Sequence, residues 1–81
     1  MNPQEAETVL TSALNRIAPE IDLSQIDRSA DLRDECDIDS MDFLNLVTAV
    51  SKETGAEIPE ADYRKLHSFD AFTLYLATHA G

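Results

Sequence analysis

The sequence predicts an all-α fold: a small four-helix bundle with three longer helices, one short third helix and a long loop between helices one and two. Three segments repeat apolar residues every three or four positions, as amphipathic helices do, and no segment alternates as a strand does. Helix start and stop signals flank these segments. With 81 residues, 43% of them hydrophobic, residues 1–81 are expected to form one domain with a single small core, which excludes a multidomain enzyme.

The first helix is expected to begin at Pro3 and to continue until Pro19 interrupts it. Asn2 is a favoured N-cap, Pro3 suits the first helical position, and Glu5 follows Asn2 by three residues. These residues satisfy amide groups that lack an acceptor within the helix. The stripe that faces the core consists of Ala6, Val9, Leu10, Ala13, Leu14 and Ile17.

Residues 18–38 lose the helical period and are expected to form a long ordered loop. A connection of about twenty residues without regular structure is unusual in a compact domain, and it tends to be functional or held by its own apolar side chains. The sequence leaves room for a short helical turn inside it. The apolar residues that have to be buried there are Ile21, Leu23, Ile26 and Leu32.

The second helix is expected to start at Asp39-Ser40 and to stop at Gly55, where a left-handed residue costs least. Because Ile58 precedes Pro59, it is pushed toward extended angles, and a short third helix over residues 60–66 can follow. The apolar residues of the second helix are Phe43, Leu44, Leu46, Val47 and Val50.

The last helix is expected to be capped by Ser68, with Gly81 as the final residue. Its inward face carries Phe69, Phe72 and Leu76. Two tyrosines, Tyr63 and Tyr75, are interpreted as aromatics at the edge of the core rather than as functional groups. We expect almost no strand.

Charge and cysteine content exclude several classes of partner and site. Sixteen Asp and Glu against six Lys and Arg give a formal net charge of −10, which repels nucleic-acid phosphates and anionic lipid headgroups. A partner with a basic docking face is the natural complement, although acidity also serves solubility alone. Cys36 is the only cysteine, so no intramolecular disulfide can form. Without a signal peptide or a membrane-spanning stretch, we expect a cytoplasmic protein with no nucleic-acid partner and no membrane span.

The informative stretch is Asp39-Ser40 at the junction between the long loop and the second helix. One interpretation is structural, because Ser is a favoured N-cap and Asp is favoured near a helix N-terminus. The other is chemical: an accessible hydroxyl can be modified, and helix amides with a positive dipole end stabilise an added phosphodiester. One residue can serve both roles.

The sequence resembles the acyl carrier protein family, whose motif Asp-Ser-Leu appears here as Asp39-Ser40-Met41. The likeness runs from the first helix to about Leu76 and includes Glu57-Ile58-Pro59-Glu60-Ala61-Asp62, which is similar to the family's approach to its short helix. The resemblance implies no catalytic residues and a covalent 4′-phosphopantetheine on Ser40. A phosphopantetheinyl transferase attaches this arm, which holds acyl groups as thioesters and presents them to enzymes of fatty-acid, polyketide or related lipid biosynthesis.

Two departures from the family pattern bear on pathway. Glu35-Cys36-Asp37 stands where the family usually has Asp-Leu-Gly, so we expect a differently shaped loop and a packing role for Cys36. The second helix is also less acidic than in housekeeping carriers, which suggests a specialised carrier. The resemblance places partner docking on this helix, at Asp39, Asp42, Asn45 and Glu53.

Other readings fit less well. The aspartates at the loop-helix junction do not have the spacing of an EF-hand calcium loop, so no metal site is expected. His67 and His79 are interpreted as helix-end residues rather than as a catalytic partner of Ser40. The alternative to a carrier is an acidic helical interaction module in which Ser40 acts only as a helix N-cap. A monomer is expected, because no apolar face is left over after one core is built.

Overall fold

The computed structural model describes residues 1–79. Five helices follow one another in this range: α1 (Pro3–Ile17), α2 (Leu32–Glu35), α3 (Ser40–Thr54), the 3₁₀ helix η1 (Glu60–Leu66) and α4 (Phe69–His79). The predicted helical bundle is confirmed, and α2 is the short turn inside the long loop. Within the described range the only strand-like feature is an isolated bridge between Asp31 and Ser68. Gly81, the expected final residue of the last helix, lies outside the described residues.

The helix boundaries follow from the capping residues. The Asn2 side chain accepts a hydrogen bond of 2.8 Å from the Glu5 amide, with Pro3 at the start of α1. Gly55 ends α3 in the left-handed region, with φ 73°, as expected for a C-terminal glycine. Ser68 caps α4 by accepting from the Ala71 amide at 3.1 Å.

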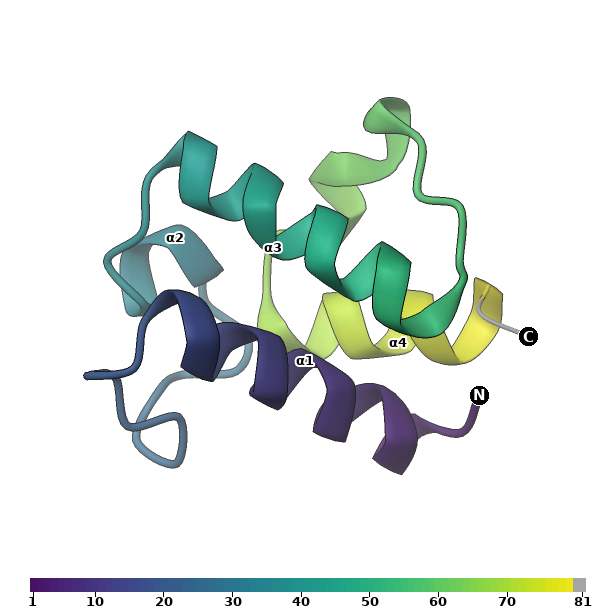
Figure 1. Cartoon of the computed structure of the whole chain (residues 1–81). Coiled ribbons are helices and arrows are strands. Elements are labelled where there is room, and N and C mark those ends of the chain that lie inside the picture. Colours follow the sequence, from purple (N-terminus) through teal and green to yellow (C-terminus); the bar gives the residue numbers. More distant parts are fainter. Residues whose placement is uncertain (80–81) are drawn as a thin grey trace.

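One core lies between α1, α3 and α4, with α1 packed against both of the others and η1 packed against α4 (Figure 1). Of the predicted stripe on α1, Val9 and Ile17 are only partly buried, and the rest is buried. On α3, Leu44 departs from its apolar neighbours because it is 49% exposed. The largest fully buried side chains are Phe72, Leu10, Leu14, Leu32, Leu46, Leu66 and Leu76. No helix in residues 1–79 is long and apolar enough to cross a membrane.

The long loop is held against the start of α4, which fixes the path of the chain toward Ser40. The Leu32 amide donates to the His67 carbonyl at 2.7 Å, and the Asp70 amide donates to the Arg28 carbonyl at 3.0 Å. The Arg28 guanidinium lies 4.5 Å from the centre of the Phe69 ring. Its own apolar residues hold the loop as well: Leu32 is buried, and the partly buried ones are Ile21, Leu23 and Ile26.

Candidate functional site

A tight turn connects α2 to α3 and delivers the chain to the serine. The Cys36 amide donates to the Leu32 carbonyl at 2.9 Å, and the Ile38 amide donates to the Arg33 carbonyl at 3.1 Å. The first is the last regular hydrogen bond of α2, and the second is the six-to-one hydrogen bond found in Schellman C-caps, where the residue before the donor is left-handed. Asp37 occupies that position with φ 52°. Asp37 therefore adopts the left-handed backbone conformation that glycine favours.

Cys36 packs in the core, as its predicted role requires. The side chain is 1% exposed and unpaired with any other sulfur. Burial raises the pKa of the Cys36 thiol, and the Glu35 carboxylate adds to the shift. A buried thiol that stays protonated is a poor nucleophile and behaves as a small apolar side chain.

The start of α3 leaves the Ser40 side chain unused by the fold. Asp39 is the N-cap: its backbone is extended, and its Oδ1 accepts from the Asp42 amide at 2.8 Å. Ser40 is the first residue of the helix, and its exposed hydroxyl makes no hydrogen bond within residues 1–79. The alternative role expected for Ser40, that of a helix N-cap, is therefore wrong, because Asp39 performs it.

Two exposed apolar side chains flank the serine on the same helix. Met41 is 75% exposed and Leu44 is 49% exposed. Residues three and four apart are neighbours on a helix surface, so Leu44 lies next to both Met41 and Ser40. The sequence interpretation missed Leu44 as a surface residue. The residues one turn before and after it, Ser40 and Thr48, are both polar, and this could have indicated that Leu44 faces solvent.

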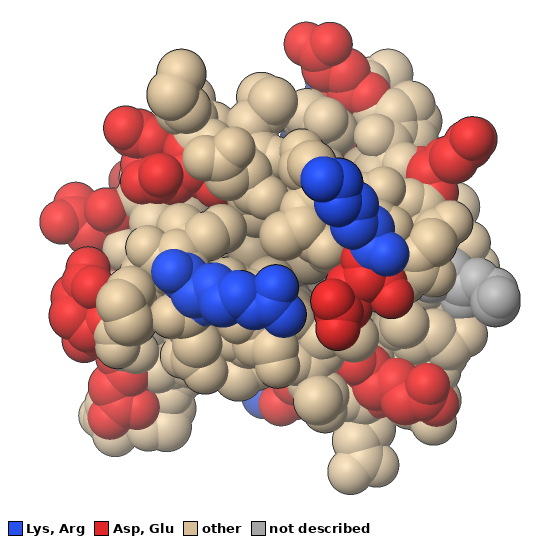
Figure 2. Space-filling view, in the orientation of Figure 1, with Lys and Arg blue, Asp and Glu red and all other residues tan. Residues whose placement is uncertain are grey.

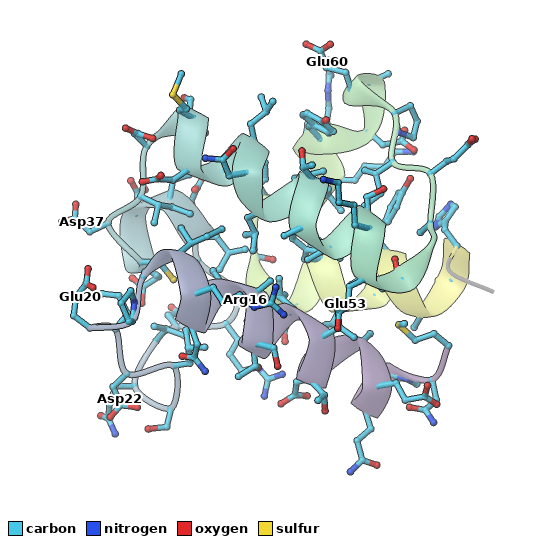
Figure 3. All side chains as sticks on the ribbon, viewed as in Figure 1. Arg16, Glu20, Asp22, Asp37, Glu53 and Glu60 are labelled. Atoms are coloured by element: carbon cyan, nitrogen blue, oxygen red, sulfur yellow. The ribbon has the colours of Figure 1, made fainter. Side chains whose placement is uncertain are left out.

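The residues expected to dock partners do not form one cluster. Asp39, Asp42 and Asn45 lie in the first half of α3 beside Ser40. Glu53 is thirteen residues further along, about 20 Å at 1.5 Å per residue. It faces Arg16 of α1 across 3.8 Å, in an exposed ion pair (Figure 3). Acidic side chains line the end of the molecule where α3 begins, and others are spread over the rest of this face (Figure 2).

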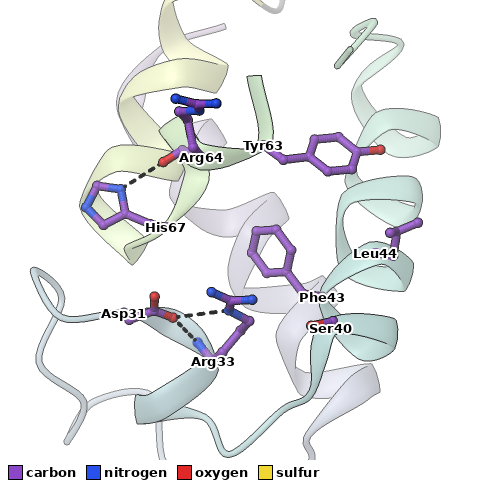
Figure 4. Close-up of a pocket in the computed structure, with 8 residues that line it drawn as sticks. All are labelled: Asp31, Arg33, Ser40, Phe43, Leu44, Tyr63, Arg64 and His67. Carbon is purple, nitrogen blue, oxygen red and sulfur yellow. Dashed lines mark hydrogen bonds and ion pairs between the residues drawn. The ribbon is translucent and has the colours of Figure 1, made fainter. Parts of the chain in front are cut away.

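A groove of about 240 Å³ opens beside Ser40, between α2, α3 and η1 (Figure 4). Its lining consists of Asp31, Arg33, Ser40, Phe43, Leu44, Tyr63, Arg64 and His67. His67 thus shares a groove with Ser40, but its Nδ1 lies 3.2 Å from the Arg64 carbonyl oxygen, and no hydrogen bond joins it to Ser40 in the described chain. His79 stacks on Tyr75 with ring centres 4.1 Å apart. Neither histidine is paired with the serine as a general base would be.

Two aspartates near the serine, Asp31 and Asp39, cap helices. Asp31 caps α2 by accepting from the Arg33 amide at 2.9 Å, as Asp39 caps α3. The pKa of Asp31 is lowered, chiefly by that amide hydrogen bond. Residues 1–79 contain no group of three or more His, Cys, Asp or Glu side chains placed to hold a metal ion.

Comparisons with known proteins agree with this geometry. A family model described as a phosphopantetheine attachment site matches residues 8–76. The acyl carrier protein of Lactobacillus johnsonii is 34% identical over 59 residues, covering 73% of this chain and 74% of the bacterial protein. Acyl carrier protein 2, mitochondrial, of Arabidopsis thaliana is 30% identical over 59 residues, covering 73% of this chain and 47% of the plant protein. The chain therefore belongs to the acyl carrier protein family, whose members bear 4′-phosphopantetheine and are carriers rather than enzymes.

Proposed function

We propose that Ser40 is the residue to which phosphopantetheine is attached. The observation that carries this proposal is the exposed Ser40 hydroxyl at the first position of α3, free of hydrogen bonds within residues 1–79 because Asp39 caps the helix. Family membership implies interaction with a phosphopantetheinyl transferase and with acyl-handling enzymes. When bound, the arm supplies a thiol that holds acyl groups as thioesters.

The start of α3 fits a phosphodiester. In the transfer from coenzyme A, Ser40 Oγ forms the new O–P bond as the bond to 3′,5′-adenosine bisphosphate breaks, and a base of the transferase takes the hydroxyl proton. The added group is an anion beside a helix N-terminus. There the Ser40 and Met41 amides have no acceptor within the helix, so they and the helix dipole favour negative charge.

The surface around Ser40 supports docking of a partner with an apolar centre and a basic rim. Met41 and Leu44 supply exposed apolar area next to the attachment point, and Asp39, Asp42 and Asn45 surround it with polar and acidic groups. Opposite charges across such a rim steer encounter more than they add affinity. Glu53 stands about 20 Å away, so it contacts only partners that extend along α3.

We propose that the carrier acts in fatty-acid, polyketide or related lipid biosynthesis and that it is specialised. The motivating feature is the reduced acidity of α3, where Asn45, Thr48, Ser51 and Lys52 replace residues that are often acidic or apolar in housekeeping carriers. We expect slow turnover of the loaded chain by general fatty-acid synthesis enzymes. Turnover as fast as that of a housekeeping carrier refutes the specialised role.

The decisive experiment is intact-mass measurement after incubation with coenzyme A and a broad-specificity transferase. Wild-type chain is expected to gain one phosphopantetheine group, and Ser40→Ala is expected to gain none. Ser51→Ala, a second serine of α3, is the matched control and should be loaded like wild type. Loading of Ser40→Ala, or no loading of wild type with several transferases, excludes Ser40 as the attachment point.

Two expectations about the whole molecule stay predictions. We place the carrier in the cytoplasm, where its single buried thiol remains reduced, and we take it to be a monomer built around one core. Cell fractionation and light scattering test them. Recovery in an organelle contradicts the cytoplasmic location, and a mass twice that of the chain contradicts the monomer.

A further inference from the structure

The groove beside Ser40 is lined by more basic than acidic side chains, although the protein is strongly acidic. Its lining contains Arg33 and Arg64, two of the six Lys and Arg residues of the chain, but only Asp31 of the sixteen acidic residues. A groove with this composition attracts an anion, whereas the rest of an acidic surface repels one.

Arg33 is the cation that faces the groove. Its Nε lies 3.6 Å from Asp31 Oδ1, and its guanidinium carbon lies 5.9 Å from the centre of the Phe43 ring. The side chain is half exposed, and its terminal nitrogens make no hydrogen bond or ion pair within residues 1–79. Figure 4 shows these nitrogens in the space between Asp31 and Phe43, whereas the Arg64 guanidinium points away from Phe43 and Ser40.

The remaining lining is apolar and leaves little room. Phe43 and Tyr63 form the part of the wall between Arg33 and Leu44. A volume of about 240 Å³ falls below the roughly 300–1,000 Å³ typical of small-molecule pockets. The groove therefore suits a short group that is apolar along its length and anionic at its end.

We propose that the groove receives a short acyl group ending in a carboxylate, and that the terminal nitrogens of Arg33 bind this carboxylate. The inference rests on the proposed attachment of the arm at Ser40. A guanidinium matches a carboxylate through two parallel hydrogen bonds, and contact with an aromatic face holds it in place. Asp31 faces Nε of Arg33 and accepts from the Arg33 amide, which leaves the two terminal nitrogens of Arg33 for a second carboxylate.

The arm itself offers a second oxyanion, the phosphodiester, which has to be distinguished from the acyl carboxylate. The phosphodiester is bonded to Ser40 on α3, next to the amides that begin that helix. Arg33 belongs to α2, on the opposite wall of the groove (Figure 4). A group at the far end of the arm reaches Arg33 only by folding back into the groove, and loading with coenzyme A alone separates this case from binding of the phosphodiester.

The test compares two acyl groups of equal length that differ only in the end group. Apo chain is loaded with coenzyme A, hexanoyl-coenzyme A or adipoyl-coenzyme A, and intact mass verifies each product. NMR then records the Arg33 Nε–Hε signal and the ring signals of Phe43 and Tyr63. Arg33→Gln removes the proposed ligand, and Arg64→Gln removes the same charge from the same groove without removing the facing guanidinium.

We expect adipoyl, but not hexanoyl, to shift the Arg33 signal. In Arg33→Gln the ratio of bound to unbound adipoyl should fall about tenfold or more, as loss of a charge-assisted hydrogen bond implies, whereas Arg64→Gln should change this ratio by much less. Equal shifts with both acyl groups, or equal effects of both variants, overturn the proposal. The proposal is also overturned if loading with coenzyme A alone already produces the full shift of the Arg33 signal, because the anion bound by Arg33 is then the phosphodiester. Failure to load is a separate result and bears on Ser40.

Discussion

Replacing Asp39 should destabilise the protein, and replacing Ser40 should not. Asp39→Ala removes the oxygen that accepts from the Asp42 amide at 2.8 Å. Loss of an N-cap costs about 0.5–2 kcal/mol, typically about 1 kcal/mol. The lost negative charge at the helix N-terminus adds about 0.3–1 kcal/mol, partly offset because the chain carries a net charge of −10.

For Ser40→Ala the same reasoning gives a change within about 0.5 kcal/mol. The hydroxyl is exposed and makes no hydrogen bond within residues 1–79, and alanine is the best helix former for a position inside the helix. Asp39→Ala should therefore lower the free energy of unfolding by about 1–1.5 kcal/mol. In a domain of this size each 1 kcal/mol corresponds to about 4–8 °C in Tm.

Urea and thermal unfolding of the apo proteins, followed by circular dichroism, measure both variants. Asp39→Asn keeps a capping oxygen and removes the charge, so it should retain most of the stability lost in Asp39→Ala. The reverse ranking, with Ser40→Ala costing about 1 kcal/mol and Asp39→Ala nothing, refutes the assignment of the cap. It would also remove the main argument that the Ser40 hydroxyl is available for modification.

Two further predictions concern strain and pH. Asp37→Gly should raise the free energy of unfolding in urea by about 0.5–1 kcal/mol, because φ 52° is strained for a residue with a side chain. Asp37→Asn removes the charge but keeps a side chain, so it measures how much of this stabilisation comes from the charge alone. Burial, with a hydrogen bond of 2.7 Å to Asp62, raises the pKa of Tyr75 from 10 to about 12. Since unfolded tyrosine ionises first, stability present below pH 10 should be lost progressively as the pH rises toward 12. Tyr75→Phe should flatten this loss, and an unchanged pH profile contradicts the argument.

Helix positions could be predicted because their signals are local. Asn2 and Pro3 mark the start of α1, and Gly55 marks the end of α3, each through backbone requirements of a few consecutive residues. The apolar repeat then assigns the buried faces. The role of Leu32 in holding the long loop was also accessible, because an apolar residue in a polar loop has to be buried somewhere.

The identity of the cap and the groove could not be predicted in the same way. Asp39 and Ser40 are both favoured N-caps, and a shift of one residue in the helix start exchanges their roles, so only the Asp42 amide contact decides. The groove depends on α2, α3 and η1 meeting in space. Arg33 and Tyr63 lie about thirty residues apart in sequence, and no local pattern indicates that they face one cavity.

Cys36 and Asp37 meet the packing and backbone requirements of their positions. Cys36 fills an apolar position with 1% of its surface exposed, and Asp37 adopts the left-handed angle that a glycine would favour. The turn delivers Ser40 to the start of a capped helix, and the left-handed angle at Asp37 stores backbone strain. Selectivity for cargo and partner then depends on the side chains that the loop and α3 place around the serine. Substitution of Arg33, which lines the groove, should alter the preference for cargo. Substitution of Met41, which is exposed outside the groove, should alter the preference for partner enzymes.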